Sequence, residues 1–338
     1  MEKNLESVMK RAPVAVLGAG SWGTALAMVL ARGGREVRLF ERDGSLAQKM
    51  QAERQNSHFL PGITFPESLS VTADYDEALN GTTATVLAVP CSAGDSVLSS
   101  ISSYDKPVIA ACKGLNPDSL ERVDELLIRH VGIERTALLS GPSFARDSAE
   151  GLPTAITMAA ADLALARHCA QLFDDPAFRI YTSTDLAGVA LGGALKNVIA
   201  IAAGIASGLN LGHSAIAALI TRGIAEISRL AVACGGRPET MSGLAGLGDL
   251  VLTCTGELSR NRKMGMALAS GMSVDEARAH VGQVVEGEKT AIAACRLAEQ
   301  HGIEMPISEI VRSVLQDEIR PDQAVSQLLN RPEKSESI

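Results

Sequence analysis

Three glycines near the start of the chain constrain its fold more than any other feature. The stretch VAVLGAGSWGTALA places Gly18, Gly20 and Gly23 directly after a short apolar run and directly before a helical pattern. In that context the first glycine permits a tight turn, the second lets a pyrophosphate approach the backbone, and the third allows close packing of helix on strand. Unpaired N–H groups at the helix N-terminus favour the same anion. The spacing predicts a dinucleotide-binding site, against the plainer interpretation that the glycines are only turn residues.

Compact apolar runs that end in Gly, Pro or polar residues alternate with helical stretches in the first half of the chain. These strand-like runs are Val14–Leu17, Glu36–Phe40, Ala84–Val89, Val108–Ala111 and Ala137–Ser140, with two more, Thr154–Met158 and Phe178–Tyr181, expected at the far side of the sheet. Helices are expected between them, for example at Thr24–Arg32 and Ser119–Arg129. Such alternation is typical of a parallel sheet with helices on both faces. We predict an α/β fold, with a Rossmann-type doubly wound dinucleotide-binding domain over residues 12–184.

Helical periodicity dominates the second half of the chain. Ser273-x-x-Glu276 has the pattern of a capping box, and Pro306 and Pro321 stand at expected first turns of helices. We predict an all-helical substrate and catalytic domain over residues 185–330, followed by a frayed polar tail over residues 331–338.

A long apolar stretch in this half, LGGALKNVIAIAAGIASG at residues 191–208, contains one charged residue, Lys196. The stretch is long enough to span a bilayer, but glycines and polar residues dilute it, so we predict a core helix of a soluble protein. Two interpretations of Lys196 stay open from this stretch alone. Its head either snorkels to the surface or stays buried with a paired charge or an altered pKa. Asp249 is the natural partner for a buried ammonium.

The charge balance limits the possible partners. A formal net charge of −8 argues against binding to nucleic acid, which depends largely on phosphate neutralisation by lysine and arginine. The start, MEKNLESVMKRAP, lacks the apolar run of a secretory signal, so we expect a cytoplasmic protein. The six cysteines lie far apart and the histidines do not cluster, which predicts neither disulfides nor a metal site.

Polar residues gather where an open parallel sheet places its ligands, beyond the carboxyl ends of its strands. After the second strand, Glu41 favours ribose hydroxyls whereas Arg42 can pair with a 2′-phosphate, so the choice between NAD and NADP stays open. The stretches ACKGL and SGPSFA follow later strands, while Gly248-Asp249-Leu250 and SRNR lie in the helical half. Ordinary loop polarity is the alternative interpretation of these stretches. A second glycine triplet, Gly243-Leu-Ala-Gly246-Leu-Gly248, follows no strand and is interpreted as a helix-breaking loop.

The motifs GAGSWGTALA, ACKGL, SGPSFA, GGALKNVIAIAAGI, GLAGLGDLVLTCT, SRNR and VVEGEK, in this order, resemble those of the NAD(P)-dependent glycerol-3-phosphate dehydrogenases from about residue 13 to 330. The resemblance implies reduction of dihydroxyacetone phosphate to sn-glycerol 3-phosphate, a glycerophospholipid precursor, with NADH or NADPH. It implies that Lys196 is the catalytic acid/base. Substrate contacts are implied for Lys113, Gly141, Ser143, Lys196, Asp249, Ser259, Arg260 and Asn261. Besides Gly18, Gly20 and Gly23, cofactor contacts are implied for Ser21, Trp22, Arg42, Lys113, Ala145, Arg260, Val284 and Glu286.

Two positions depart from the family pattern. Trp22 stands where many members have Phe or Tyr, and Glu41 stands where some have a small residue, which weakens the case for NADP. The residues otherwise suit the chemistry, because an ammonium can stabilise and protonate the oxygen that becomes negative when hydride reaches a ketone carbon. Arg260, followed by Asn261, suits a phosphate better than a lysine does. The chemistry requires no metal.

Two other functions stay open. A β-hydroxyacid dehydrogenase also joins a Rossmann domain to a helical domain and uses a lysine soon after a Gly-Gly pair, but its substrate carries a carboxylate in place of a phosphate. A non-catalytic regulator that only senses NADH does not need Lys196, Asp249 and Arg260. We further expect a phosphorylated small-molecule substrate, no membrane insertion, and a homodimer.

Overall fold

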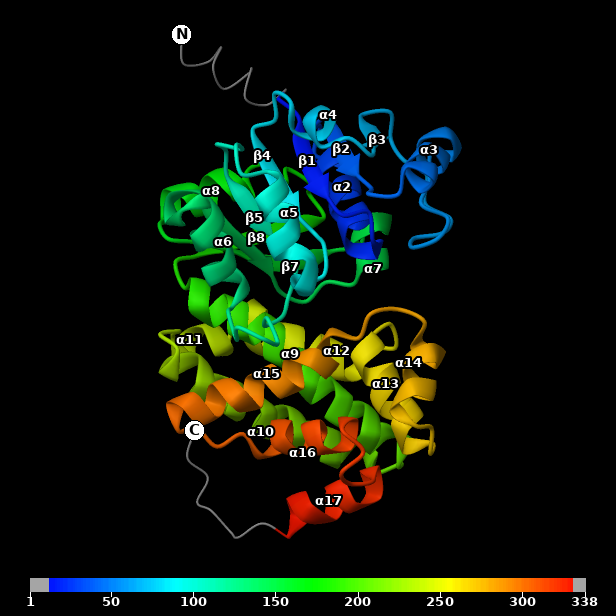
Figure 1. The fold of residues 1–338 in the computed structure, drawn as a ribbon, viewed down its shortest axis with the longest axis vertical. Coiled ribbons are helices and arrows are strands. Elements are labelled where there is room, and N and C mark those ends of the chain that lie inside the picture. Colours follow the sequence, from blue (N-terminus) through cyan, green and yellow to red (C-terminus); the bar gives the residue numbers. More distant parts are fainter. Residues whose placement is uncertain (1–11, 331–338) are drawn as a thin grey trace. The chain divides into compact units, whose positions relative to one another are not determined.

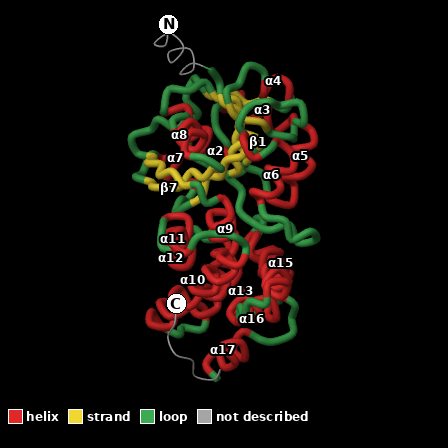
Figure 2. Tube along the Cα trace, turned by 90° about the vertical axis from the view of Figure 1, so that its left-hand side faces the viewer, coloured by secondary structure: helices red, strands yellow, loops and turns green. Residues whose placement is uncertain are grey.

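The computed structural model describes residues 12–330, and contacts divide the chain into two units. Unit 1 contains the described residues up to Cys112 together with Val123–Leu186, and unit 2 contains Lys113–Arg122 and the described residues from Ala187 onward. The strands of the described chain lie in unit 1, and unit 2 is built from helices (Figure 1, Figure 2). The predicted fold class is confirmed. The tail predicted at residues 331–338 lies outside the described residues.

Unit 1 is built on one eight-stranded sheet with the order β3-β2-β1-β4-β5-β6-β7-β8. The strands are β1 (Val14–Leu17), β2 (Val37–Phe40), β3 (Leu69–Thr72), β4 (Ala84–Leu87), β5 (Val108–Ala110), β6 (Thr136–Ser140), β7 (Thr154–Ala160) and β8 (Phe178–Ser183). β1 pairs in parallel with β2 on one side and β4 on the other. The strand order therefore reverses at β1, and open α/β sheets bind their ligands beyond the strand ends at such a point.

Two features of the sheet differ from the sequence prediction. The prediction has no strand at β3, because its four residues, LSVT, are too few and too polar to form a recognisable apolar run. β7 runs antiparallel to β6, whereas β8 runs parallel to β7 at the sheet edge where both were expected. A short buried strand carries the same apolar pattern in either direction, so the sequence offers no signal of the reversal.

The helices of unit 1 are α2 (Ser21–Arg32), α3 (Gly44–Glu53), α4 (Tyr75–Leu79), α5 (Gly94–Ser100), α6 (Val123–Val131), α7 (Ala145–Glu150) and α8 (Leu163–Ala170). α2 consists largely of apolar residues, and it is buried from Gly23 to Ala31. Its last residue, Arg32, donates hydrogen bonds of 2.6 Å to the carbonyls of Ala149 and Ser148 on α7. Burial along one helix and this anchor at its end hold the α2 N-terminus in place beside β1.

Unit 2 packs its helices around α9 (Leu186–Gly208). The others are α10 (Gly212–Ala233), α11 (Pro238–Met241), α12 (Asp249–Thr255), α13 (Arg260–Ala269), α14 (Val274–Val281), α15 (Glu286–His301), α16 (Pro306–Leu315) and α17 (Pro321–Leu329). By length and composition α9 can cross a bilayer, yet its most apolar 18 residues are buried inside the protein. The prediction of a core helix is confirmed.

Helix α9 touches its neighbours backbone to backbone at glycines. A Cβ added to Gly204 would lie 2.1 Å from the carbonyl oxygen of Arg262, and one added to Gly265 would lie 2.1 Å from that of Ile201. No side chain fits at these two positions without separating α9 from α13. The two glycines therefore set how near the first turn of α13 lies to the middle of α9, where Lys196 stands.

Helix starts in unit 2 follow the sequence signals, with one exception. Ser273 and Glu276 form the predicted capping box at α14, and Pro306 and Pro321 open α16 and α17. The glycine triplet at residues 243–248, however, is not a helix-breaking loop: Leu244–Gly248 forms a π-helical turn that continues into α12. That prediction was wrong because close packing compensates for the low helix propensity of glycine.

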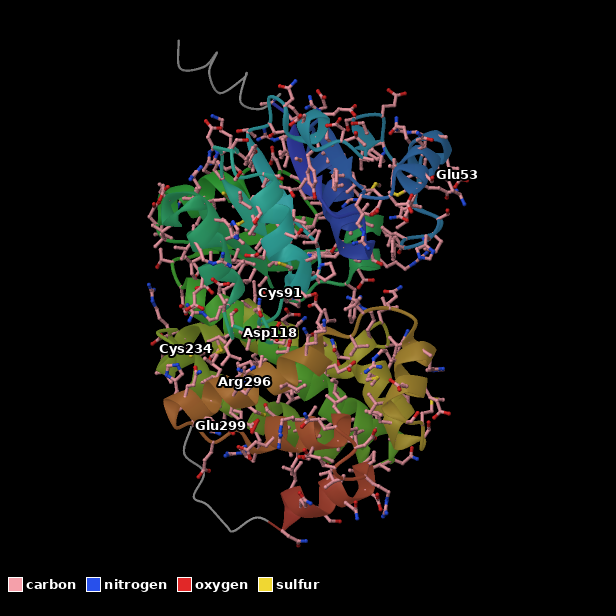
Figure 3. All side chains as sticks on the ribbon, viewed as in Figure 1. Glu53, Cys91, Asp118, Cys234, Arg296 and Glu299 are labelled. Atoms are coloured by element: carbon pink, nitrogen blue, oxygen red, sulfur yellow. The ribbon has the colours of Figure 1, made fainter. Side chains whose placement is uncertain are left out.

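The segment Lys113–Arg122 was predicted within the dinucleotide-binding domain but makes its contacts with unit 2. Leu115 and Leu120 belong to the apolar core around α9. Arg296 of α15 donates a hydrogen bond of 2.7 Å to the carbonyl of Pro117, which precedes Asp118 in the chain; Figure 3 labels Arg296 and Asp118. Two leucines in a short polar segment give no periodicity, so the sequence does not show which core they join.

Candidate active site

The glycine loop of unit 1 joins β1 to α2. Gly18 has a φ of 110°, and a Cβ there would lie 2.9 Å from the carbonyl oxygen of Ala88. A Cβ on Gly23 would lie 1.9 Å from the carbonyl oxygen of Gly18, whereas one on Gly20 would have no atom of the described chain beyond its neighbours within 4 Å. The expected backbone roles of the first and third glycines are confirmed. Gly20 borders open space at the start of α2, as a pyrophosphate cradle requires.

Four residues predicted or weighed as cofactor contacts surround this loop. Ser21 donates its hydroxyl to the carbonyl of Phe59 at 2.7 Å, while the indole N–H of Trp22 is buried and has no hydrogen-bond partner among the described residues. At the end of β2, the Glu41 carboxylate accepts the backbone N–H of Asp43 at 3.1 Å. Arg42 is exposed and forms no ion pair within residues 12–330. Glu41 is thus engaged locally, and the guanidinium is available to a ligand.

The stretch SGPSFA turns the chain between β6 and α7. Gly141 has a φ of 145° and packs so closely on β7 that a Cβ would lie 3.0 Å from the Cα of Ile156. Ser143 donates its hydroxyl to the Gly141 carbonyl at 3.1 Å, and Ala145 begins α7. These residues lie at the carboxyl end of β6, the sheet edge that also carries the glycine loop.

Charged side chains converge in the core of unit 2. Lys196 on α9 is only 7% exposed, and its ammonium binds the carboxylate of Asp249, the first residue of α12, which is fully buried. The other carboxylate oxygen of Asp249 accepts a hydrogen bond of 2.6 Å from Lys113. A Cβ on Gly192 would lie 2.6 Å from the Ala245 carbonyl, so this glycine lets α9 approach the turn that carries Asp249. The pairing predicted for Lys196 is confirmed, and the snorkelling interpretation is wrong.

The surroundings of Lys196 tune its protonation. Burial lowers its pKa to about 8, although the Asp249 carboxylate opposes that effect and the Lys113 ammonium adds to it. Thr253, one turn along α12 from Asp249, accepts a second hydrogen bond from the ammonium at 3.0 Å and donates its own proton to the Asp249 backbone carbonyl. An ammonium has three N–H donors, so one is left for a substrate oxygen. A lysine in this state can donate a proton near neutral pH.

The first turn of α13 presents polar groups beside this cluster. Ser259 caps the helix by accepting the Arg262 backbone N–H at 3.2 Å, which leaves its own O–H to donate. Arg260 is exposed and forms no hydrogen bond or ion pair with another described residue. Asn261 is buried and donates to the side-chain oxygen of Asn197 on α9 at 2.9 Å. This turn can offer a hydroxyl and a guanidinium to a phosphate.

The loop before α15 and the first residue of that helix carry the last two predicted cofactor contacts. Val284 is 55% exposed, and Glu286, the first residue of α15, is partly buried. Burial raises the pKa of Glu286 above its ordinary value, against the opposing effects of Arg260, Lys113 and Lys196. The structure therefore brings Glu286 together with the cations of unit 2.

Thr253 and Asn197 were missed by the sequence analysis. Thr253 lies four residues after Asp249 on one face of α12, a spacing that identifies helical neighbours once the helix itself is known. The sequence analysis named no helix over residues 249–255, so that spacing carried no meaning. Asn197 directly follows Lys196, and no pattern distinguishes it from an ordinary polar residue in an apolar helix.

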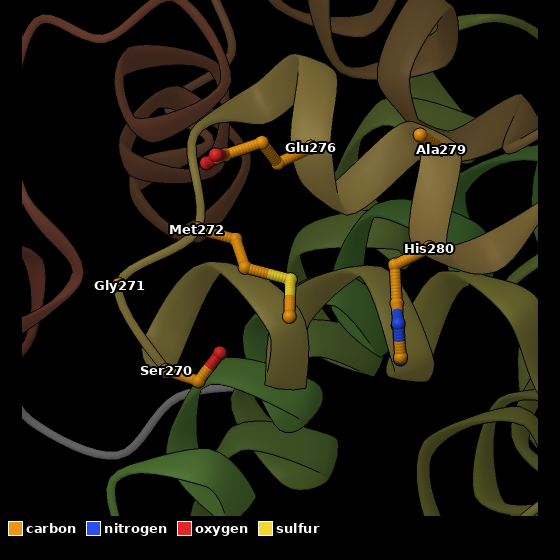
Figure 4. A pocket seen from close by; sticks show the side chains of 6 residues that line it. All are labelled: Ser270, Gly271, Met272, Glu276, Ala279 and His280. Atoms are coloured by element: carbon orange, nitrogen blue, oxygen red, sulfur yellow. The ribbon is translucent and has the colours of Figure 1, made fainter.

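A depression on the surface of unit 2 is lined by other residues. It is lined by Ser270, Gly271, Met272, Glu276, Ala279 and His280, between α13 and α14 (Figure 4). Ser270 donates its hydroxyl to the Ala267 carbonyl, and Glu276 is held in the capping box with Ser273. The polar groups of Ser270 and Glu276 thus complete helix ends, and none of the predicted site residues lines the depression.

Comparisons with known proteins identify relatives over nearly the whole chain. Models of the N-terminus and C-terminus of NAD-dependent glycerol-3-phosphate dehydrogenase match residues 13–166 and 185–326. Glycerol-3-phosphate dehydrogenase [NAD(P)+] of Geobacter sulfurreducens is 47% identical over 96% of this chain and 98% of its own length, and that of Halorhodospira halophila is 48% identical over the same shares. The crystal structure of glycerol-3-phosphate dehydrogenase from Coxiella burnetii covers 95% of this chain and 100% of its own, with 41% identity and a TM-score of 0.91. The chain therefore belongs to the family of NAD(P)-dependent glycerol-3-phosphate dehydrogenases, which are oxidoreductases.

Proposed function

We propose that this protein reduces dihydroxyacetone phosphate to sn-glycerol 3-phosphate, reversibly, with NADH or NADPH. The observation that carries the proposal is the buried Lys196–Asp249–Lys113 cluster, because it holds an ammonium that can protonate a ketone oxygen. The reduced nicotinamide supplies the hydride. The glycine loop suits such a cofactor, since Gly20 borders open space and the first turn of α2 contains no acidic residue.

In this proposal Lys196 is the catalytic acid. Asp249 and Thr253 orient its ammonium, and the remaining N–H donates to the carbonyl oxygen of the substrate. As negative charge develops on that oxygen, the ammonium stabilises it and then transfers its proton. A pKa of about 8 suits the role, because the group is largely protonated at neutral pH and still able to lose the proton.

The phosphate of the substrate binds at the first turn of α13. Arg260 offers a planar, multi-donor cation, and the Ser259 hydroxyl adds a further donor. Asn261 holds this turn against α9 through Asn197. Gly141 and Ser143 of unit 1 are included as substrate contacts on the basis of the family resemblance. The remaining proposed cofactor contacts, Ser21, Trp22, Arg42, Ala145 and Val284, rest on the same basis.

An absorbance assay tests the reaction and the cofactor together. The purified protein is mixed with dihydroxyacetone phosphate and either NADH or NADPH, and the loss of absorbance of the reduced cofactor is recorded. Dihydroxyacetone without the phosphate and a panel of β-keto acids serve as comparison substrates. We expect rapid oxidation only with the phosphorylated ketone. Faster turnover of a keto acid, or none with any substrate, would contradict the proposal.

We also propose that the enzyme acts in the cytoplasm as a homodimer, without membrane insertion, and supplies glycerophospholipid synthesis. The first half of α10 supports a dimer, because Ile216, Leu219 and Ile220 are only partly covered there. Light scattering of the eluting protein tests the mass in solution. Depletion of the enzyme in cells, followed by measurement of labelled glycerol incorporated into lipid, tests the metabolic role.

A further inference from the structure

Glu286 differs from the other carboxylate in the cation cluster. Asp249 is fully buried and bonded to two ammonium groups, Lys196 and Lys113. Glu286 is partly buried, interacts electrostatically with the same two lysines and with Arg260, and accepts no hydrogen bond on its side chain from any residue in the described range. The cluster therefore contains one carboxylate that is hydrogen-bonded to two ammonium groups, Asp249, and one that accepts no hydrogen bond from a described residue, Glu286.

The position of Glu286 is fixed by its neighbour in the chain. The backbone N–H of Gly287 donates to the side-chain oxygen of Asn261 at 3.0 Å. A Cβ on Gly287 would lie 2.6 Å from that oxygen and 2.7 Å from the carbonyl oxygen of Asn197. Asn261 directly follows Arg260, and Asn197 directly follows Lys196. The start of α15 is therefore locked against the helices that carry Lys196 and Arg260, and Glu286 has little freedom to move away from these two cations.

The charges of the cluster do not match a phosphate while Glu286 is ionised. Lys113, Lys196 and Arg260 contribute three positive charges, and Asp249 and Glu286 contribute two negative charges when both are ionised. One net positive charge is left, whereas a phosphate monoester carries nearly two negative charges above its second pKa of about 6. Protonation of Glu286 raises the net charge of the cluster from one to two positive charges. It also removes the negative charge that repels the phosphate.

We propose that Glu286 takes up a proton from solvent when the substrate's phosphate binds, so that substrate capture is coupled to proton uptake. This inference rests on the proposed function. It gives Glu286 a role as a positioning residue for the phosphate through charge, in addition to any cofactor contact, and it explains why an acid stands among cations that an anionic substrate needs.

The direction of the coupling follows from the surroundings. Burial already raises the pKa of Glu286 above its ordinary value, and a bound phosphate raises it further by like-charge repulsion. Between the two pKa values the enzyme binds a proton together with the ligand, so the affinity falls by about tenfold per pH unit as the pH rises through that interval. The same charge effect makes Lys196, with a pKa of about 8, the rival source of uptake.

The other carboxylates near Glu286 are already paired with basic side chains. Asp249 on α12 lies between the two lysines. Glu288, on the same turn of α15 as Glu286, is paired at the surface with Arg278 of α14, which also binds Asp275. Glu288 therefore offers a matched control carboxylate, two residues away and outside the cation cluster.

Isothermal titration calorimetry tests the proposal. sn-Glycerol 3-phosphate is titrated into enzyme saturated with reduced cofactor, a pair that cannot react, in two buffers of different ionisation enthalpy at pH values from about 6.5 to about 9. The difference in heat between buffers gives the number of protons bound per ligand. The variants are E286Q, E286D and the control E288Q, with circular dichroism to confirm folding.

We expect wild type and E288Q to take up a substantial fraction of a proton and to lose affinity as the pH rises. E286Q should take up much less and bind about tenfold more tightly than wild type at the upper end of the range. E286D, which keeps a titrating carboxylate, should restore the uptake, and this comparison holds even if the glutamine variant folds poorly.

Equal or greater uptake in E286Q than in wild type would assign the proton to Lys196 and overturn the inference, because removing a negative charge lowers the pKa of that lysine. Binding of sn-glycerol 3-phosphate by wild type without any proton uptake would also overturn it, while leaving the proposed function intact. A wild-type protein that does not bind sn-glycerol 3-phosphate at all would overturn both.

Discussion

The glycine loop of unit 1 and the lysine cluster of unit 2 suit their proposed sites for opposite reasons. The loop works through backbone: Gly18 and Gly23 are required where no side chain fits, and Gly20 borders open space at a helix N-terminus. The cluster works through buried charge, with Lys196 and Asp249 removed from water and paired. One region depends on the absence of side chains, and the other depends on the chemical identity of a few.

The difference shows how each region tolerates change. A backbone site is destroyed by added volume, and the damage extends to folding, because the same close contacts hold helix to strand. A charge site can lose its chemistry while the fold survives, provided that the replacement fills the same space. The predictions below test this contrast, from the largest expected effect to the smallest.

Replacing Lys196 with Met should abolish turnover while leaving the fold intact. The unbranched side chain fills the space of the lysine stem, but it has no proton to donate, so we expect kcat to fall by roughly 10³-fold or more. Lys263→Met, at an exposed position on α13, is the matched control and should retain activity. Steady-state kinetics and a urea unfolding curve measure both properties. Wild-type turnover in the Lys196 variant would remove it as the catalytic acid.

Replacing Gly23 with Ala should lower the stability of the protein, whereas replacing Gly20 with Ala should not. The Cβ at Gly23 meets the Gly18 carbonyl oxygen at 1.9 Å, so we expect a loss of about 1–3 kcal/mol in the free energy of unfolding, or more. The Cβ at Gly20 meets open space, so that variant should lose affinity for NADH at unchanged stability. Urea denaturation and NADH titration separate the two effects. Equal destabilisation of both variants would contradict the contrast.

Replacing Asp249 with Asn should shift the pH profile of the reduction. Asp249 holds the pKa of Lys196 up against burial, so its removal lowers that pKa below about 8. In the proposed mechanism, reduction needs the protonated lysine, so the activity that wild type loses as the pH rises through about 8 should be lost at lower pH in the variant. We expect about a tenfold loss in kcat/KM at neutral pH, with the profile of kcat/KM against pH as the measurement. An unmoved profile would show that Asp249 does not control the lysine.

Replacing Glu226 with Gln should alter stability against pH without touching the site. Glu226 on α10 is 1% exposed and accepts the Ile307 backbone N–H at 2.6 Å, and burial raises its pKa from 4.5 to about 8. The folded state therefore binds a proton that the unfolded state releases between these values, and the stability from this group is present at low pH and lost as the pH rises through about 8.

The Glu226→Gln variant should show a flatter dependence of the urea midpoint on pH across that window, with kcat unchanged. This is the smallest expected effect on activity. It tests whether a buried carboxylate outside the proposed site affects only the stability of the protein. A midpoint with the same pH dependence in both proteins would show that Glu226 is not the titrating group.

Much of the fold followed from local patterns. The glycine loop, seven of the eight strands and the starts of α14, α16 and α17 were predicted because each depends on residues a few positions apart. β3 and the direction of β7 were not, since four residues of mixed polarity carry too little signal and a buried strand looks the same in both directions. The π-helical turn before Asp249 was also missed, because close packing of glycines overrode their low helix propensity.

The candidate site, like the fold, was predicted only in part. The residue types and motifs were present in the sequence, and the family resemblance named most of them. Apart from the predicted pair of Lys196 and Asp249, their grouping was not predicted, because Lys113, Arg260 and Glu286 come from further separate elements. No local pattern shows that Lys113–Arg122 joins the helical unit.

By itself, then, the sequence determined what is local: a strand, a tight glycine turn and a helix, which together suit a phosphate, and an apolar helix that must be buried. Only the tertiary structure decided the charge state of the site. Whether the Lys196 ammonium pairs, snorkels or loses its proton depends on how far water is excluded and how near Asp249 and Lys113 come, and both are set by helix packing.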